Sequence, residues 1–124
     1  DRLGADLRYG TLEGADLSGS NLADAKLTTA NLGRAKLSEA RLAGADLYGA
    51  NLEGADLRGA DLRGTDLRRS KLAQADLRGA DLRGADLREA DLFGADFRDA
   101  DLREANLEMT AFGGQRYNDY INVA

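Results

Sequence analysis

Leucine at every fifth position limits what this chain can fold into. From Leu7 to Phe112, each position five apart is Leu or Phe, which gives 22 consecutive hits, with Phe only at 97 and 112. A small residue stands two positions before each of them. It is Ala in most repeats and Gly, Ser or Thr at 10, 20, 65, 70 and 110. The residue in between is usually Asp or Asn, and two variable residues follow, the second of which is often Gly.

A period of five argues against an α-helix. A step of five residues turns a helix by about 500°, so successive leucines would be displaced by about 140° around its axis. They would leave no buried stripe. The small residue and the Leu are two apart, which is strand alternation, whereas the step of three to the next small residue requires a turn. Each unit is therefore predicted as a three-residue strand plus a corner, where glycines such as Gly14, Gly44 and Gly79 suit a positive φ.

Such a short unit cannot bury its own Leu, but stacked copies can, as in other solenoids. The unit A(D/N)LXX, which runs through residues 5–112 without an insertion, resembles the motif of the pentapeptide-repeat proteins. The chain is identified as a near-consensus member of the bacterial or cyanobacterial type. This resemblance implies an all-β fold, a right-handed quadrilateral parallel β-helix with four pentapeptides per coil and about five and a half coils.

The two ends depart from the repeat. Residues 1–4 form a short lead-in, and residues 113–124 follow the last hit. Tyr117, Tyr120 and Ile121 have the i, i+3, i+4 spacing of one helical face, so they are predicted to form a short cap beside Phe112. The alternative, which the resemblance implies, is a homodimer contact through this segment.

Composition excludes several classes of protein. The chain has 22 acidic and 17 basic residues and a net charge of -5, which argues against direct binding to nucleic acid or to an anionic membrane. No apolar run reaches the roughly 20 residues of a membrane span, and no signal peptide is visible in these residues. We therefore expect a cytoplasmic location, although a targeting segment removed ahead of Asp1 is compatible with the sequence.

Catalysis is not expected either. The chain contains neither His nor Cys, so the usual general base and the usual transition-metal ligands are missing. Carboxylates recur throughout without one pair being singled out, and a filled convex rod lacks the concave, partly dry site that catalysis needs. No catalytic residue, metal site or cofactor is predicted.

A coil of 20 residues would stack residues 20 apart into columns. Three faces would then carry ladders of Asp with ladders of Arg beside them, which we interpret as a device for solubility and register. The fourth face carries fewer charges and an outward Phe. Its residues Asn31, Asn51, Lys71, Asp91 and Phe93 are predicted to meet an unknown protein partner, the alternative being an ordinary solvated surface.

Two functions follow from these observations. The first is a non-enzymatic structural or protein-interaction module, a rigid rod that docks a partner. The second, suggested by the branch of the family that inhibits DNA gyrase, is an inhibitor or protector of a type II topoisomerase that mimics DNA. The modest net charge, the abundant Arg and the lack of a projecting loop all weaken this second hypothesis.

Overall fold

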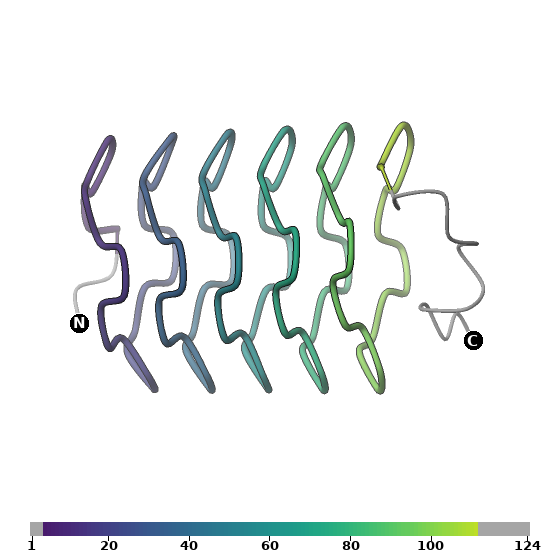
Figure 1. Cartoon of the computed structure of the whole chain (residues 1–124), viewed down its shortest axis with the longest axis horizontal. Helices are drawn as coiled ribbons and strands as arrows, with labels where there is room; N and C mark the ends of the chain where they lie inside the picture. The colour runs from purple at the N-terminus through teal and green to yellow at the C-terminus, as the bar shows by residue number, and fades with distance from the viewer. Residues whose placement is uncertain (1–3, 112–124) are drawn as a thin grey trace.

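The chain winds into a stack of similar coils. In this computed structural model, residues 4–111 are described, and Figure 1 shows their coils following one another along the long axis of the molecule. Parallel β-bridges join residues 20 apart, from Asp6↔Lys26 at one end to Asp91↔Ala111 at the other. Four pentapeptides therefore complete one coil, as predicted. The predicted total of about five and a half coils counts Phe112, which lies outside the described residues, and stays a prediction.

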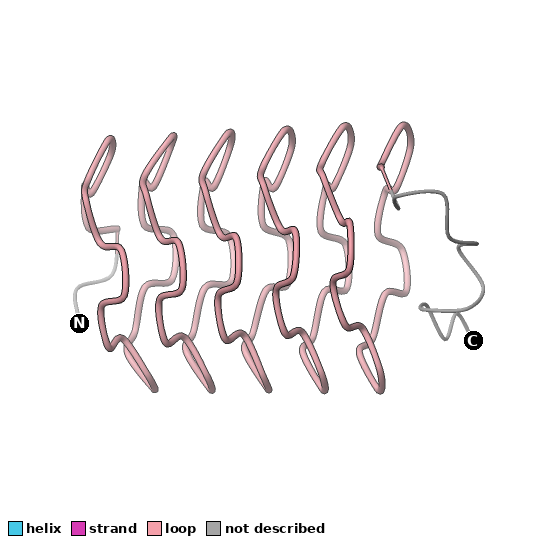
Figure 2. Ribbon diagram, in the orientation of Figure 1, coloured by secondary structure: helices cyan, strands magenta, loops and turns pink. Residues whose placement is uncertain are grey.

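Within residues 4–111 there is no helix and no extended strand, as Figure 2 shows. Each unit instead contributes one isolated bridge residue, which alternates with a two-residue turn. The predicted three-residue strand is therefore too long, because only one residue of each unit forms a bridge and the turn follows directly after the Leu. The carbonyl of Leu77 accepts the N–H of Ala80, at 3.0 Å, which closes the turn. Between coils, Leu77 donates to the Asp96 carbonyl at 2.8 Å and Asp76 donates to the Ala55 carbonyl at 2.9 Å.

The second residue of each turn lies in the left-handed region. Every fifth residue from Gly4 to Met109 has a φ between 54° and 73°. This is the conformation at the third position of a type II turn, where Gly is favoured because it has no Cβ. The prediction for the corner glycines is therefore confirmed. Half of these corners nevertheless carry a side chain, and Thr29, at φ 54°, is even β-branched.

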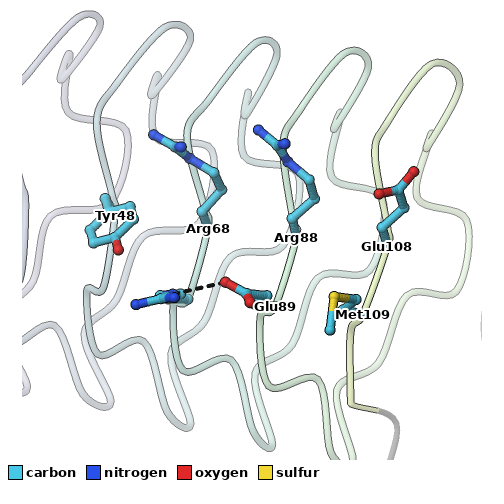
Figure 3. Close-up of a pocket in the computed structure, with 7 residues that line it drawn as sticks. Tyr48, Arg68, Arg88, Glu89, Glu108 and Met109 are labelled. Carbon is cyan, nitrogen blue, oxygen red and sulfur yellow. Dashed lines mark hydrogen bonds and ion pairs between the residues drawn. The ribbon is translucent and has the colours of Figure 1, made fainter.

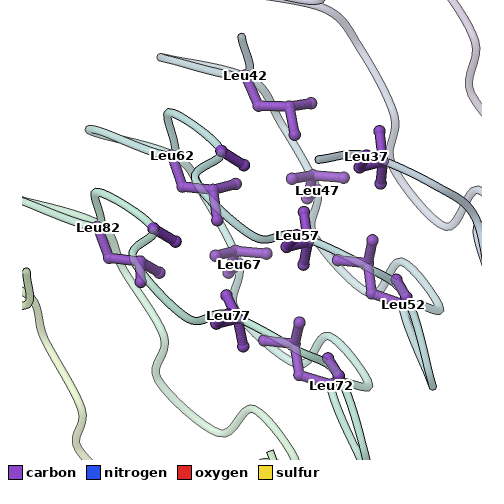
Figure 4. Packing of buried hydrophobic residues seen from close by; sticks show 14 of the residues in the cluster. Leu37, Leu42, Leu47, Leu52, Leu57, Leu62, Leu67, Leu72, Leu77 and Leu82 are labelled. Carbon is purple, nitrogen blue, oxygen red and sulfur yellow. The ribbon is translucent and has the colours of Figure 1, made fainter. Parts of the chain in front are cut away.

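The core is a narrow column of Leu lined by Ala. From residue 22 to residue 102 the leucines and alanines at the inward positions are buried, together with Phe97. Figure 4 shows leucines of successive coils stacked on one another, for example Leu42, Leu62 and Leu82. Two inward hydroxyls remain satisfied, because Thr65 donates to the Leu62 carbonyl at 2.9 Å and Ser70 donates to the Leu67 carbonyl at 2.7 Å.

Some predictions fall beyond this core. The predicted lead-in lies mostly outside the described residues, and so does the predicted cap or dimer segment with Phe112, Tyr117, Tyr120 and Ile121. In the stretch from 4 to 111, no helix is long and apolar enough to cross a membrane.

Candidate functional site

The Asp or Asn that precedes each Leu caps the following turn. Its side-chain oxygen accepts the backbone N–H two residues later, as in Glu53 N–H to Asn51 Oδ1 at 3.0 Å and Phe93 N–H to Asp91 Oδ1 at 3.1 Å. Short side chains with an acceptor oxygen make this local bond, whereas Lys and Arg have no acceptor. The preference for Asp or Asn therefore reflects turn formation as well as charge. The sequence carries this signal in the exchange of Asp for Asn, which the charge-based interpretation overlooked.

Where Arg follows two residues after the Asp, the two side chains form a bidentate ion pair. In the pair of Asp76 and Arg78, Nε donates to Oδ1 at 2.8 Å and Nη2 donates to Oδ2 at 2.6 Å. The described residues hold nine such pairs, in which Asp6, Asp56, Asp61, Asp66, Asp76, Asp81, Asp86, Asp96 and Asp101 each bind the Arg two residues later.

The ladders of Asp and Arg lie side by side on one face, because both residues of each pair belong to the same pentapeptide. A second approach links neighbouring coils, since Arg58 Nε lies 3.9 Å from Asp76 Oδ2. The hydrogen bonds from Arg103 lower the pKa of Asp101 from 3.8 to about 2, and those from Arg58 lower the pKa of Asp56. The Asp ladders therefore stay ionised and paired in neutral solution.

The structure brings the five predicted partner residues together on one face. Bridges connect Asn31 to Asn51, Asn51 to Lys71 and Lys71 to Asp91, so these residues form one column, and Phe93 lies beside its end. We call this surface the Asn face. It comprises the column 11, 31, 51, 71, 91 and the column 13, 33, 53, 73, 93. The Asn51 amide donates to Asn31 Oδ1 at 3.3 Å, and 49% of Phe93 is exposed.

A depression of about 330 Å³ opens on the Asn face and its corner. Gly33 contributes open space to it, since a Cβ there would lie 3.3 Å from Asn31 Oδ1. Its lining is polar and comprises Glu13, Gly33, Arg34, Asn51, Glu53, Gly54 and Gln74. The sequence predicted a face with fewer charges, and the corner residue Arg34 borders it. The 20-residue register would have revealed Arg34 if the corner position had been included in the face.

A second depression, also of about 330 Å³, lies on a face that the sequence did not single out. In Figure 3, Tyr48, Arg68, Arg88 and Glu108 occupy the same position on successive coils, with Glu89 and Met109 in the next row. The guanidinium of Arg68 lies 5.2 Å from the centre of the Tyr48 ring, a cation–π distance. In the next row, Arg69 Nε donates to Glu89 Oε2 at 2.8 Å.

The described part of the chain contains no group of three or more His, Cys, Asp or Glu side chains that could hold a metal ion. The side chains that line the two depressions offer hydrogen bonds, charge and stacking.

The comparisons with solved structures agree on one fold. A pentapeptide repeat protein from the thylakoid lumen of Arabidopsis thaliana is 36% identical to the chain, with a TM-score of 0.65, and the match covers 79% of this chain and 72% of that one. Rfr23, a pentapeptide repeat protein from the cyanobacterium Cyanothece 51142, has a TM-score of 0.87 at 27% identity, and the match covers 89% of both chains. QnrB1, a plasmid-mediated fluoroquinolone resistance protein, is 21% identical over 87% of this chain and 65% of that chain, with a TM-score of 0.43.

The sequence comparisons agree with this fold. The curated proteins give no significant match. The profile described as pentapeptide repeats (8 copies) matches residues 4–38, 35–74 and 70–108, which together span most of the chain. With coils of 20 residues, capped turns and a Leu and Ala core, this chain belongs to the pentapeptide repeat family.

Proposed function

We propose that the chain is a non-enzymatic structural and protein-interaction module, a rigid rod that docks a partner protein through the Asn face. The observation that carries the proposal is the half-exposed ring of Phe93 on this face. Aromatic side chains are enriched in the cores of protein interfaces, where their burial supplies much of the binding energy.

The surroundings of Phe93 support a docking role. The amides of Asn31 and Asn51 offer polar groups on neighbouring coils, and no bidentate Arg pair covers this column among residues 4–111. The backbone bonds between successive coils hold the columns in a fixed register, so a partner would meet a preformed surface. Such a surface best fits a partner protein that binds without a large rearrangement.

Photo-crosslinking tests this proposal. The photoreactive residue p-benzoylphenylalanine would replace Phe93 in one variant and Arg83, on another face, in a control variant. We expect a specific crosslinked protein with the variant at 93 and not with the variant at 83, and the Phe93→Asp protein should compete poorly for that partner. Identical products from both positions, or no product at 93, would contradict the proposal.

DNA mimicry of the kind that inhibits gyrase has less support. A DNA mimic presents free negative charge, whereas nine of the Asp side chains here are bound by Arg. In the pair with Arg98, for example, only 31% of the Asp96 side chain is exposed, against 70% of the Arg98 side chain. The outermost groups on these faces are therefore guanidinium edges, which would not substitute for phosphates.

The predicted homodimer through residues 113–124 is a separate proposal. Light scattering of the whole chain and of a chain that ends at residue 112 would test it. A dimer that persists without residues 113–124 would contradict it.

A further inference from the structure

One face of the rod keeps side chains at its corners although the backbone there favours Gly. This face comprises the column 8, 28, 48, 68, 88, 108 and the corner column 9, 29, 49, 69, 89, 109, and we call it the Tyr48 face. Five of its six corner residues have a side chain at positive φ, the exception being Gly49. The other three faces together have a side chain at only six of sixteen described corners. Strained backbone of this kind often marks a functional surface.

The side chains at the strained corners of the Tyr48 face, and those beside them, have the composition of a binding surface. Tyr9 is 76% exposed and Met109 is 80% exposed, and these are two of the three exposed large hydrophobic residues in the described part of the chain. Between them lie Tyr48 and the depression of about 330 Å³ seen in Figure 3. Tyr, Met and Arg are the residue types enriched in protein interfaces.

The outer layer of the Tyr48 face is cationic, although the chain as a whole carries a net charge of -5. Its two columns hold four basic residues, Arg8, Arg68, Arg69 and Arg88, against two acidic ones, Glu89 and Glu108. The aspartates beneath are recessed. In the pair with Arg68, 27% of the Asp66 side chain is exposed, against 43% of the Arg68 side chain.

The guanidinium groups of Arg68 and Arg88 also have unused hydrogen-bond donors. Arg68 binds Asp66 through Nε and Nη2, and Arg88 binds Asp86 through the same two atoms. Within residues 4–111, their Nη1 groups donate to no other residue, so each Arg can still bind an outside carboxylate while it keeps its own Asp. The Tyr48 ring and the Met109 side chain provide an apolar contact area beside these donors.

From the strain, the exposed apolar groups and the cationic outer layer, we infer that the Tyr48 face binds an acidic segment of a partner protein. The carboxylates of that segment would bind the free edges of Arg68 and Arg88, and an apolar side chain would pack on Tyr48. The inference is independent of the Asn face, which lies on another side of the coil.

Fluorescence polarisation with a short labelled peptide of Glu and Phe tests the inference, and the same peptide with Lys in place of Glu serves as its counterpart. We expect the acidic peptide to bind and its Lys counterpart not to bind. Arg68→Gln should weaken binding about tenfold, as the loss of a charge-assisted hydrogen bond would.

The matched variants Arg69→Gly and Arg34→Gly remove the same side chain from two corners, at φ 58° and φ 55°. Both should raise the melting temperature or leave it unchanged, because Gly relieves the strain. Only Arg69→Gly should weaken peptide binding, because it removes one of the four basic residues of the Tyr48 face and leaves Glu89 without its ion pair, whereas Arg34 lies on the corner beside the Asn face.

Three outcomes would overturn the inference. The first is an equal loss of binding in the two Gly variants, and the second is tighter binding of the Lys peptide or of oligothymidylate. The third is self-association of the chain, measured by light scattering, that Arg69→Gly abolishes, since the face would then be a contact between copies. None of these outcomes affects the crosslink expected at position 93.

Discussion

Replacing Asp76 by Asn and by Ala separates two roles of this side chain. Asp76 Oδ1 accepts the backbone N–H of Arg78 at 3.2 Å, which caps the turn, and its carboxylate also forms the bidentate pair with the Arg78 side chain. Asn keeps the acceptor oxygen for the turn and loses the charge. Ala loses both. Asp91 is the matched control, because it caps the turn at Phe93 N–H, at 3.1 Å, and has no ion pair within residues 4–111.

The magnitudes follow from the two contributions. A hydrogen bond of this kind contributes about 0.5–1.5 kcal/mol to the free energy of unfolding. A solvent-exposed ion pair contributes about 0–1 kcal/mol. We therefore expect Asp76→Ala to destabilise by about 1–2 kcal/mol and Asp76→Asn by less than about 1 kcal/mol. Asp91→Asn should be close to neutral, while Asp91→Ala should cost about 0.5–1.5 kcal/mol.

Urea unfolding followed by circular dichroism measures these differences. The measurement should be repeated at about 1 M salt, where the Debye length falls to about 3 Å and the ion-pair contribution shrinks, while the cap contribution remains. Asn as destabilising as Ala at both positions would refute the capping role. A loss at Asp91→Asn equal to that at Asp76→Asn would refute the separation of cap from charge.

Three further predictions concern the corners, the charges and the function. Gly79→Ala should destabilise the fold by about 1 kcal/mol. The added Cβ meets no atom within 4 Å, so the cost is the strain of a left-handed residue, about 1–2 kcal/mol, and about 0.5–1 kcal/mol of backbone entropy offsets part of it. Glu104→Gly should have the opposite sign, and thermal melting of both variants checks the pair. The pKa of Asp101 is lowered from 3.8 to about 2, so the contribution of this carboxylate to stability is complete above pH 3.8 and is lost as the pH falls towards 2. Urea unfolding across that window should show a falling midpoint. DNA supercoiling by gyrase should be unaffected by micromolar amounts of the chain, and inhibition would contradict the charge-pair argument.

The sequence predicted the coil well because period five and burial leave few alternatives. The inward Leu and Ala and the corner Gly follow from which residues can be buried and which can adopt a positive φ, whereas the 20-residue register was implied by the resemblance to the pentapeptide-repeat proteins. The Asp76 cap was not predicted, because Asp was interpreted as a charge and its exchange with Asn at the same position of the repeat was overlooked. The depression beside Tyr48 was missed for a different reason. Its lining comes from two adjacent columns, such as 48 with 69 and 89, and the sequence was divided into columns one at a time.

The constant length of the coil makes sequence position a coordinate on the rod. Twenty residues move a side chain about 4.8 Å along the axis without changing its face, whereas five residues move it to the next face. Loss of one pentapeptide would leave the inward pattern of Leu and Ala intact, yet everything after it would turn by a quarter of a coil. If the loss fell between Tyr48 and Arg88, Arg88 would no longer lie in the column of Tyr48. A repeat protein of this kind can therefore change which surfaces are aligned without changing its core, and alignment across faces is preserved only when repeats are gained or lost in fours.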